Sequence, residues 1–122
     1  MICHGVKELV AKATSEIETI PIEGADLLIE NSEIILVDIR DVRELERDGT
    51  IPGSVHVPRG MLEFWVDPES PYHREVFASD KTFVFFCASA WRSALATKTV
   101  QDMGLKKVAQ LNAILYQTLM DF

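Results

Sequence analysis

Short apolar segments alternate with segments whose apolar residues recur at helical spacing. The apolar segments lie at 34–37, 55–57, 82–86 and 108–111, and a brief extended piece at 16–20 ends at Pro21. Apolar runs of this length without polar alternation are typical of strands that are covered on both faces, as in a parallel sheet. We therefore predict five strands, of which 82–86 is the clearest.

The segments between these strands favour helices. Apolar spacing predicts helices over 6–13, 22–29, 91–103 and 114–122, and helical turns near 61–65 and 72–77. Asp41 can cap a short helix, with Glu44 three residues later as in a capping box. Strands that alternate with helices indicate one α/β domain over residues 1–122, with a central, mostly parallel five-stranded sheet flanked by helices on both faces.

Length, charge and cysteine content narrow the class of protein. A chain of 122 residues fits one domain, and its net charge of −7 opposes non-specific binding to nucleic acid or to an anionic membrane. No apolar run is long enough for a spanning helix, and the first residues do not resemble a signal peptide. The two cysteines, Cys3 and Cys87, are too few for a disulfide framework or a zinc site. We expect a cytoplasmic protein without metal or cofactor.

The segment that carries chemistry follows the clearest strand. Residues 87–93 read Cys-Ala-Ser-Ala-Trp-Arg-Ser and lead into the helix predicted at 91–103. A short loop in this position can direct backbone N–H groups and the positive end of a helix dipole at one point, which stabilises a thiolate. Arg92 adds a positive charge to the same rim. A buried structural cysteine is the alternative, but it leaves Arg92 and the position at a helix start unexplained.

Three motifs together resemble the rhodanese-like family. Cys87 and Arg92, with four residues between them, are similar to the six-residue active loop of that family, and Ser93-Ala94 continues the likeness. Residues 37–40 (Val-Asp-Ile-Arg) resemble its V-D-x-R segment, and residues 49–54 (Gly-Thr-Ile-Pro-Gly-Ser) resemble its G-x-I-P-G-A turn. The three motifs occur in the order and at the spacing of the family.

The resemblance implies a sulfurtransferase of the thiosulfate type. Cys87 would attack the outer sulfur of a small anionic donor such as thiosulfate and hold that sulfur as a persulfide, which the backbone N–H groups of residues 88–92 (Ala88, Ser89, Ala90, Trp91 and Arg92) would stabilise. A thiol, or cyanide in the test tube, would accept the sulfur. Arg92 would orient the donor, whereas Asp38 and Arg40 are expected to form a structural ion pair near the site.

Two other functions remain open on the sequence. Related phosphatases have five residues between cysteine and arginine and commonly a histidine before the cysteine, where this chain has Phe86; both differences disfavour phosphate. A non-catalytic binding or redox-sensing module is the other alternative, because a reactive thiol is also prone to oxidation. The chain departs from the family at Ala90, where glycine is common, and after Asn112, where a Gly-Gly turn is usual. A homodimer that covers the surface near the C-terminus is therefore a further hypothesis.

Overall fold

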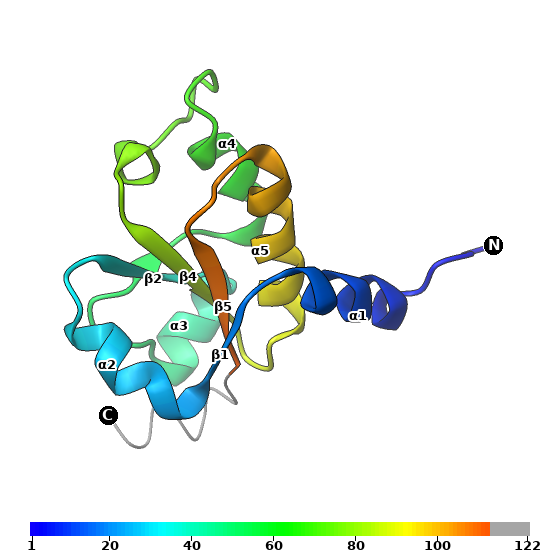
Figure 1. The fold of residues 1–122 in the computed structure, drawn as a ribbon, viewed down its shortest axis with the longest axis horizontal. Helices are drawn as coiled ribbons and strands as arrows, with labels where there is room; N and C mark the ends of the chain where they lie inside the picture. Colours follow the sequence, from blue (N-terminus) through cyan, green and yellow to red (C-terminus); the bar gives the residue numbers. More distant parts are fainter. Residues whose placement is uncertain (113–122) are drawn as a thin grey trace.

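A twisted parallel sheet forms the centre of the molecule (Figure 1). In the computed structural model, residues 1–112 of the chain are described. The strands are β1 (Thr19–Pro21), β2 (Ile34–Asp38), β3 (Val55–His56), β4 (Thr82–Phe86) and β5 (Val108–Asn112). They lie in the order β1-β5-β4-β2-β3, and every neighbouring pair is parallel. The predicted five-stranded α/β architecture is confirmed.

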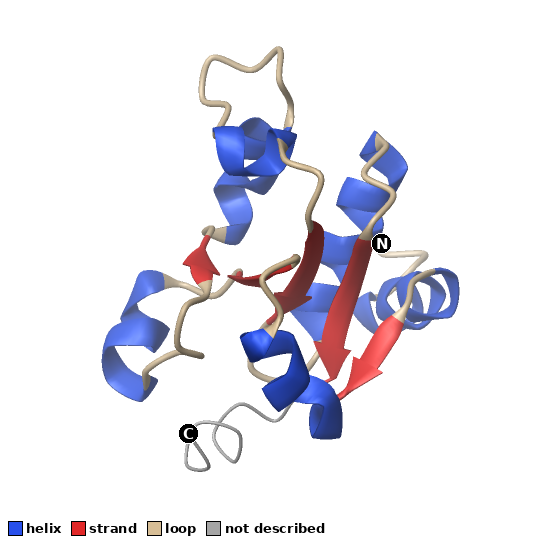
Figure 2. Cartoon of the chain, turned by 60° about the vertical axis from the view of Figure 1, so that its left-hand side comes forward, coloured by secondary structure: helices blue, strands red, loops and turns tan. Residues whose placement is uncertain are grey.

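Helices cover both faces of this sheet (Figure 2). The α-helices are α1 (Val6–Glu16), α2 (Ala25–Glu30), α3 (Val42–Asp48), α4 (Leu62–Val66) and α5 (Trp91–Met103), and short 3-10 turns occupy Ile22–Gly24, Arg59–Met61 and Glu75–Ala78. Helix α5 packs on β4 and β5, and α1 and α4 pack in turn on α5. Helix α2 lies against the opposite face, where its Leu28 belongs to a second apolar cluster.

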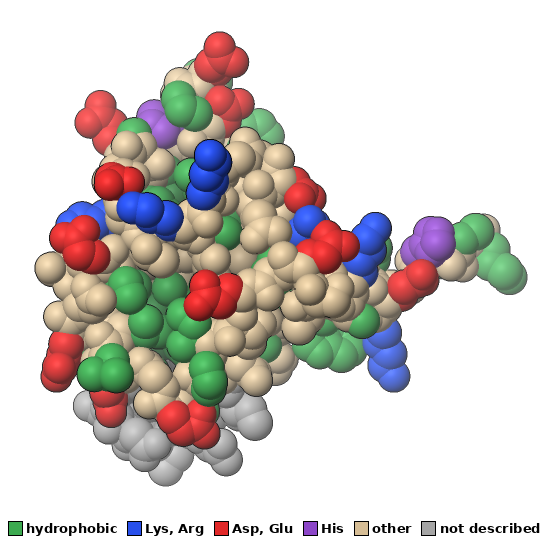
Figure 3. All heavy atoms as spheres, viewed as in Figure 1, with side chains coloured by type: hydrophobic (Ala, Val, Ile, Leu, Met, Phe, Trp, Pro, Cys, Tyr) green, Lys and Arg blue, Asp and Glu red, His purple; other side chains and the backbone are tan. Residues whose placement is uncertain are grey.

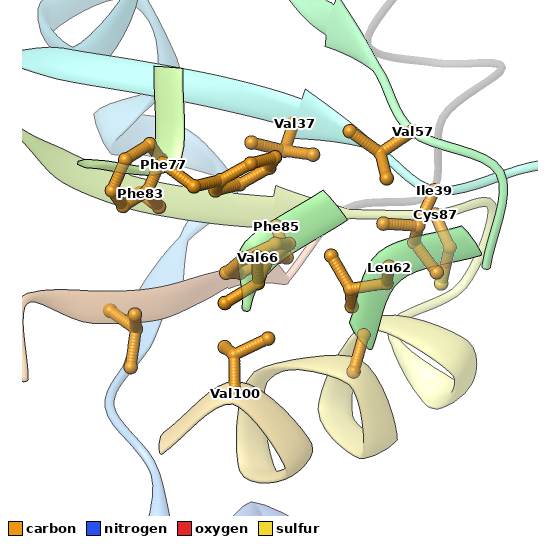
Figure 4. Close-up of a cluster of buried hydrophobic side chains, with 12 residues drawn as sticks. Val37, Ile39, Val57, Leu62, Val66, Phe77, Phe83, Phe85, Cys87 and Val100 are labelled. Atoms are coloured by element: carbon orange, nitrogen blue, oxygen red, sulfur yellow. The ribbon is translucent and has the colours of Figure 1, made fainter. Parts of the chain in front are cut away.

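Strand β4 divides its side chains between these two clusters. Phe83 and Phe85 point into the cluster beneath α4 and α5 (Figure 4), whereas Val84 and Phe86 belong to the cluster beneath α2. All four are at most 2% exposed, as expected for a strand in the middle of a parallel sheet. Cys87 continues the alternation and lies on the α5 side of the sheet.

Element boundaries near the N-terminus differ from those that the sequence predicts. The first helix continues to Glu16, whose carboxylate pairs with Lys98 of α5, so the strand begins only at Thr19. The segment predicted as one helix over 22–29 is a 3-10 turn followed by α2, which starts after Gly24, a residue type that disfavours helix interiors. The helix predicted at 114–122 lies outside the described residues.

Charged side chains of both signs are distributed over the face shown in Figure 3, with acidic groups spread across it. Among residues 1–112, no helix is both long enough and apolar enough to span a bilayer.

Candidate active site

The predicted site residues meet at the carboxyl edge of the sheet. Cys87 directly follows β4, and Asp38 is the last residue of β2, where it pairs in register with Phe86. The backbone N–H of Ile39 donates to the Phe86 carbonyl, which locks the ends of the two strands together. Ligands of open parallel sheets bind at this edge, so Cys87 lies where a reactive group is expected.

The Cys87 side chain is almost enclosed, with 1% of its surface exposed. It packs in the apolar cluster with Ile39 and Leu62 (Figure 4). The backbone N–H of Ser93 donates to its sulfur at 3.3 Å, and the thiol donates to the Ser93 hydroxyl at 3.4 Å. Both partners come from the first turn of α5, whose N-terminus carries a partial positive charge.

The loop between Cys87 and α5 turns sharply at Ala90. Its backbone is left-handed, with φ 68° and ψ 8°, and within the described part of the chain it is the one non-glycine residue with positive φ. Ala88 is partly buried and Ser89 is exposed, while Trp91 begins α5 with 45% of its surface exposed. The family resemblance predicts that the N–H groups of residues 88–92 surround the sulfur. In the described residues, the backbone N–H bonded to it belongs to Ser93, one position further along.

Arg92 is held by an acidic partner that the sequence analysis did not identify as part of the site. Its guanidinium donates to the two carboxylate oxygens of Glu44 on α3, at 2.8 and 3.0 Å. This bond to Glu44 raises the pKa of Arg92, and the same bond lowers the pKa of the Glu44 carboxyl against a smaller opposing effect of burial. An anionic ligand that binds Arg92 would therefore compete with Glu44.

Asp38 and Arg40 form a buried ion pair beside the loop. Arg40 Nη2 lies 2.8 Å from Asp38 Oδ2, and the two side chains are 1% and 0% exposed. Arg40 also donates to the Gly49 carbonyl at 2.7 Å, and the Thr50 hydroxyl donates to Asp38 at 2.6 Å. The pair joins the end of β2 to the turn at 49–54. The ion pair that the sequence predicts is therefore present, and its structural role stays a prediction.

That turn explains two glycines of the second motif. Gly49 and Gly53 have φ angles of 78° and 80°, in the left-handed region that glycine adopts without strain. Gly49 ends α3 and Gly53 precedes β3, so the motif brings the chain back into the sheet beside β2.

Gln110 is a second residue that the sequence analysis missed. It lies in β5, is 2% exposed, and accepts a hydrogen bond from the Ser93 hydroxyl at 2.7 Å. Its own amide donates to the Thr19 hydroxyl of β1 at 3.2 Å. A signal was present, because Gln110 is the polar residue within the otherwise apolar segment 108–111.

Comparison with known proteins agrees with this geometry. A family model described as "Rhodanese-like domain" matches residues 22–113, about three quarters of the chain. The chain belongs to the rhodanese-like family. This match covers four of the five strands, β2 to β5, together with the active loop, and begins directly after β1.

Individual rhodanese-like relatives point to sulfur transfer, with one exception. A Bacillus subtilis protein named "Putative sulfurtransferase" is 32% identical over 78 residues, which cover 64% of this chain and 67% of the relative. A polysulfide-sulfur transferase homodimer from Wolinella succinogenes is 28% identical, with a TM-score of 0.66, and the match covers 94% of this chain and 82% of that one. A solved structure from Rhodopseudomonas palustris is 50% identical, with a TM-score of 0.94, and the match covers 99% of this chain and 93% of that one. That protein is described as one of unknown function and "Possible Tyrosine Phosphatase". The rhodanese-like fold and the sulfurtransferase relatives place this chain in a sulfurtransferase-type family.

Proposed function

We propose that the protein transfers a sulfane sulfur from a small anionic donor such as thiosulfate to a thiophilic acceptor, through a persulfide on Cys87. The observation that carries this proposal is the position of the sulfur. It lies at the carboxyl edge of the sheet and accepts an N–H from Ser93 in the first turn of α5, the turn that also contains Arg92. In this proposal Cys87 and Arg92 act on the substrate, and residues 88–91 form the loop that binds it.

The chemistry requires two displacements. The Cys87 thiolate attacks the outer sulfur of thiosulfate, so that a new S–S bond forms while the original S–S bond breaks and sulfite leaves with its electron pair. The acceptor, a thiolate in the cell or cyanide in the test tube, then attacks the outer sulfur of the persulfide and releases the Cys87 thiolate. A compartment with reduced thiols, such as the cytoplasm, would supply this acceptor.

The site favours a small donor. Because only 1% of the Cys87 surface is exposed, a bulky group cannot surround the sulfur, whereas one sulfur atom at the end of a small anion needs little space. Arg92 would bind the anionic end of the donor once its hydrogen bonds to the Glu44 carboxylate break. The name of the Wolinella succinogenes homodimer indicates a polysulfide as its sulfur donor. A polysulfide donor would use the same two groups here, Cys87 to accept the sulfur and Arg92 to bind the anion.

Mass spectrometry of the protein after incubation with thiosulfate tests the proposal. We expect a mass gain of one sulfur atom on the peptide that contains Cys87. Cys87→Ala should take up no sulfur, and Cys3→Ser is the matched control because Cys3 is exposed at the N-terminus, outside the site. The proposal fails if the wild-type protein takes up no sulfur, or if the Cys3→Ser variant loses the modification and Cys87→Ala keeps it.

A phosphatase is the second candidate, since the 50% identical protein from Rhodopseudomonas palustris is described as a possible tyrosine phosphatase. The loop opposes this function. Four residues separate Cys87 from Arg92, one fewer than in the related phosphatases, and Phe86 stands before the cysteine. Hydrolysis of p-nitrophenyl phosphate decides the matter: we expect the wild-type rate to equal that of Cys87→Ala. A wild-type rate well above this background would favour the phosphatase.

A non-catalytic binding or redox-sensing module is the third candidate. A sensor needs a thiol that oxidants such as peroxide reach, and the enclosure of Cys87 limits access for peroxide and for thiosulfate alike, so burial does not separate the two functions. The sulfur-uptake experiment also separates this candidate, because a sensor would be oxidised by peroxide without taking sulfur from thiosulfate.

We also propose that the protein is a homodimer. The Wolinella succinogenes relative is a homodimer, which supports a homodimer here. Light scattering coupled to size-exclusion chromatography should give twice the monomer mass. A mass equal to that of the monomer would reject the dimer and leave the sulfur chemistry untouched.

A further inference from the structure

A chain of hydrogen bonds leads from the sulfur of Cys87 to the edge of the sheet. The thiol contacts the Ser93 hydroxyl at 3.4 Å, this hydroxyl contacts Gln110 Oε1 at 2.7 Å, and Gln110 Nε2 contacts the Thr19 hydroxyl at 3.2 Å. Cys87, Ser93 and Gln110 are each at most 2% exposed. The mechanism proposed above uses Cys87 but assigns no role to Gln110 or Thr19.

All three bonds of this chain run in one direction. The Cys87 thiol donates to Ser93, Ser93 donates its single hydroxyl hydrogen to Gln110, and Gln110 donates an amide hydrogen to Thr19. A serine hydroxyl has one hydrogen but can accept as well. In this arrangement the Ser93 hydroxyl therefore points away from the sulfur, and its lone pairs receive the thiol proton.

This direction suits a neutral thiol and conflicts with an anionic sulfur. A thiolate or a persulfide anion is an acceptor only, so the Ser93 hydroxyl must turn its hydrogen toward the sulfur to bind it. That rotation removes the hydrogen between Ser93 Oγ and Gln110 Oε1, which lie 2.7 Å apart. Two oxygen acceptors in contact at this distance without a hydrogen repel each other, and a buried acceptor without a donor is costly.

Rotation of the Gln110 amide removes this conflict. When the amide turns by half a turn, Nε2 donates to Ser93 Oγ, and Oε1 faces Thr19, whose hydroxyl is able to donate as well as accept. The amide nitrogen and oxygen have nearly the same size, so the exchange requires no repacking of the buried strand. The side-chain polar atoms of Ser93, Gln110 and Thr19 then have hydrogen-bond partners both before and after the amide turns. A leucine or methionine at position 110 would offer neither arrangement.

We propose that Gln110 is a positioning residue of the sulfur-transfer reaction, whose side-chain amide turns over as Cys87 changes from thiol to anion and so releases the Ser93 hydroxyl to donate to the sulfur. The inference rests on the proposed role of Cys87 as the nucleophile. Gln110 touches no substrate and acts through Ser93.

Three ion pairs lie on the elements around the active loop, and in the described residues none of their side chains is hydrogen-bonded to Gln110. Arg92 of α5 is bound to Glu44 of α3, and the Asp38–Arg40 pair lies at the end of β2. On the α4 side, Arg59 is paired with Glu63. In the described residues none of these charged groups is hydrogen-bonded to the sulfur, whereas Gln110 is linked to it through the Ser93 hydroxyl. The test must therefore observe the amide itself.

Nuclear magnetic resonance of the full ¹⁵N,¹³C-labelled chain provides this test. Below the pH midpoint of Cys87 alkylation by iodoacetamide, we expect the Gln110 side-chain amide protons to give Overhauser contacts to the Thr19 methyl group. Above the midpoint these contacts should be replaced by contacts to the Ser93 β-protons. The Cys87→Ala variant is the control and should keep the Thr19 contacts at every pH. Contacts to Thr19 that persist in the wild-type protein above the midpoint overturn the inference.

A variant at Ser93 gives a second, functional measurement. Ser93→Ala should raise the pH midpoint of Cys87 alkylation by about one unit, because the anionic sulfur loses a hydroxyl donor. If the hydroxyl instead remained on Gln110 throughout, its removal would leave the midpoint unchanged or lower it, and the inference would be wrong. The resonance experiment observes the wild-type protein itself, so the inference remains testable if Ser93→Ala does not fold.

The two proposals fail in different ways. A protein that takes sulfur from thiosulfate on Cys87 but keeps the Thr19 contacts refutes the role of Gln110 alone. A protein whose amide turns with Cys87 ionisation but that takes up no sulfur refutes the sulfurtransferase function alone.

Discussion

Ala90 carries a conformational cost at the tightest point of the active loop. Its φ of 68° is unfavourable for any residue with a Cβ atom, and glycine would adopt it without strain. We predict that Ala90→Gly raises the free energy of unfolding by about 0.5–1 kcal/mol, because relief of strain exceeds the added entropy of the unfolded chain. Urea denaturation measures this change. An equal or lower midpoint would mean that the surrounding structure has already absorbed the strain.

Glu44 competes with an anionic donor for Arg92. Glu44→Gln removes the charge but keeps the size of the side chain, so Arg92 becomes freer to bind thiosulfate. Because 43% of the Arg92 side chain is exposed, the pair is partly screened. We therefore expect a two- to fivefold fall, roughly, in the KM for thiosulfate in a thiosulfate–cyanide assay.

A matched variant separates this effect from a general change in charge. Asp80→Asn makes the same chemical change in a carboxylate that pairs with Lys107 at the opposite end of β4 from Cys87. Its KM should equal that of the wild-type protein. The prediction about Glu44 is wrong if both variants lower KM equally, or if Glu44→Gln raises it.

For single residues, the sequence predicts those that stand in a short contiguous motif. It does not predict contacts between residues that lie far apart along the chain. Cys87, Arg92 and the pair Asp38 and Arg40 could be chosen because each stands in a short motif at a strand end. The contact between Glu44 and Arg92 spans 48 positions, and that between Ser93 and Gln110 spans 17. Partners this far apart become neighbours only through the order of the strands, which local patterns do not encode.

At the scale of elements, α5 contains a polar group without a partner. Thr97 lies one turn after Ser93, is 0% exposed, and its hydroxyl has no hydrogen-bond partner among the described residues. Thr97→Val replaces this hydroxyl by a methyl group of nearly the same size. We predict that it raises the free energy of unfolding by about 1 kcal/mol, since an unsatisfied buried hydroxyl costs free energy. Thermal or urea unfolding would contradict this if the variant were less stable than the wild-type protein.

The elements that were predicted well are those whose periodicity reflects burial on both faces. Strand β4 matches the segment 82–86, and α5 matches 91–103, each with the bounds that the apolar pattern and Gly104 indicate. The N-terminal boundaries were wrong by a few residues because tertiary contacts decide them. Glu16 remains helical against Lys98, and Pro21 joins β1, an edge strand in which a residue without an N–H is tolerated.

At the scale of the whole molecule, acidic groups outnumber basic ones, with 19 Asp and Glu against 12 Lys and Arg. Stability in acid therefore depends on which carboxylates are bound in the folded state. The bond to Arg92 holds the pKa of Glu44 below its usual value, so the unfolded chain binds the proton more readily than the folded one. This contribution is fully present above the usual pKa of about 4.3 and is lost as the pH falls through the lower folded value.

Glu44→Gln should reveal that contribution as a difference that depends on pH. At pH 7 the wild-type protein should be more stable than the variant, by less than about 1 kcal/mol because the pair is partly exposed. The difference should shrink as the pH falls below about 4, since protonation of Glu44 in the wild-type protein then removes the same charge that the substitution removes. Urea unfolding at a series of pH values measures both curves. Parallel curves down to pH 3 would show that the ion pair between α3 and the active loop adds no stability of its own, and Glu44 would then act only as a competitor for the donor.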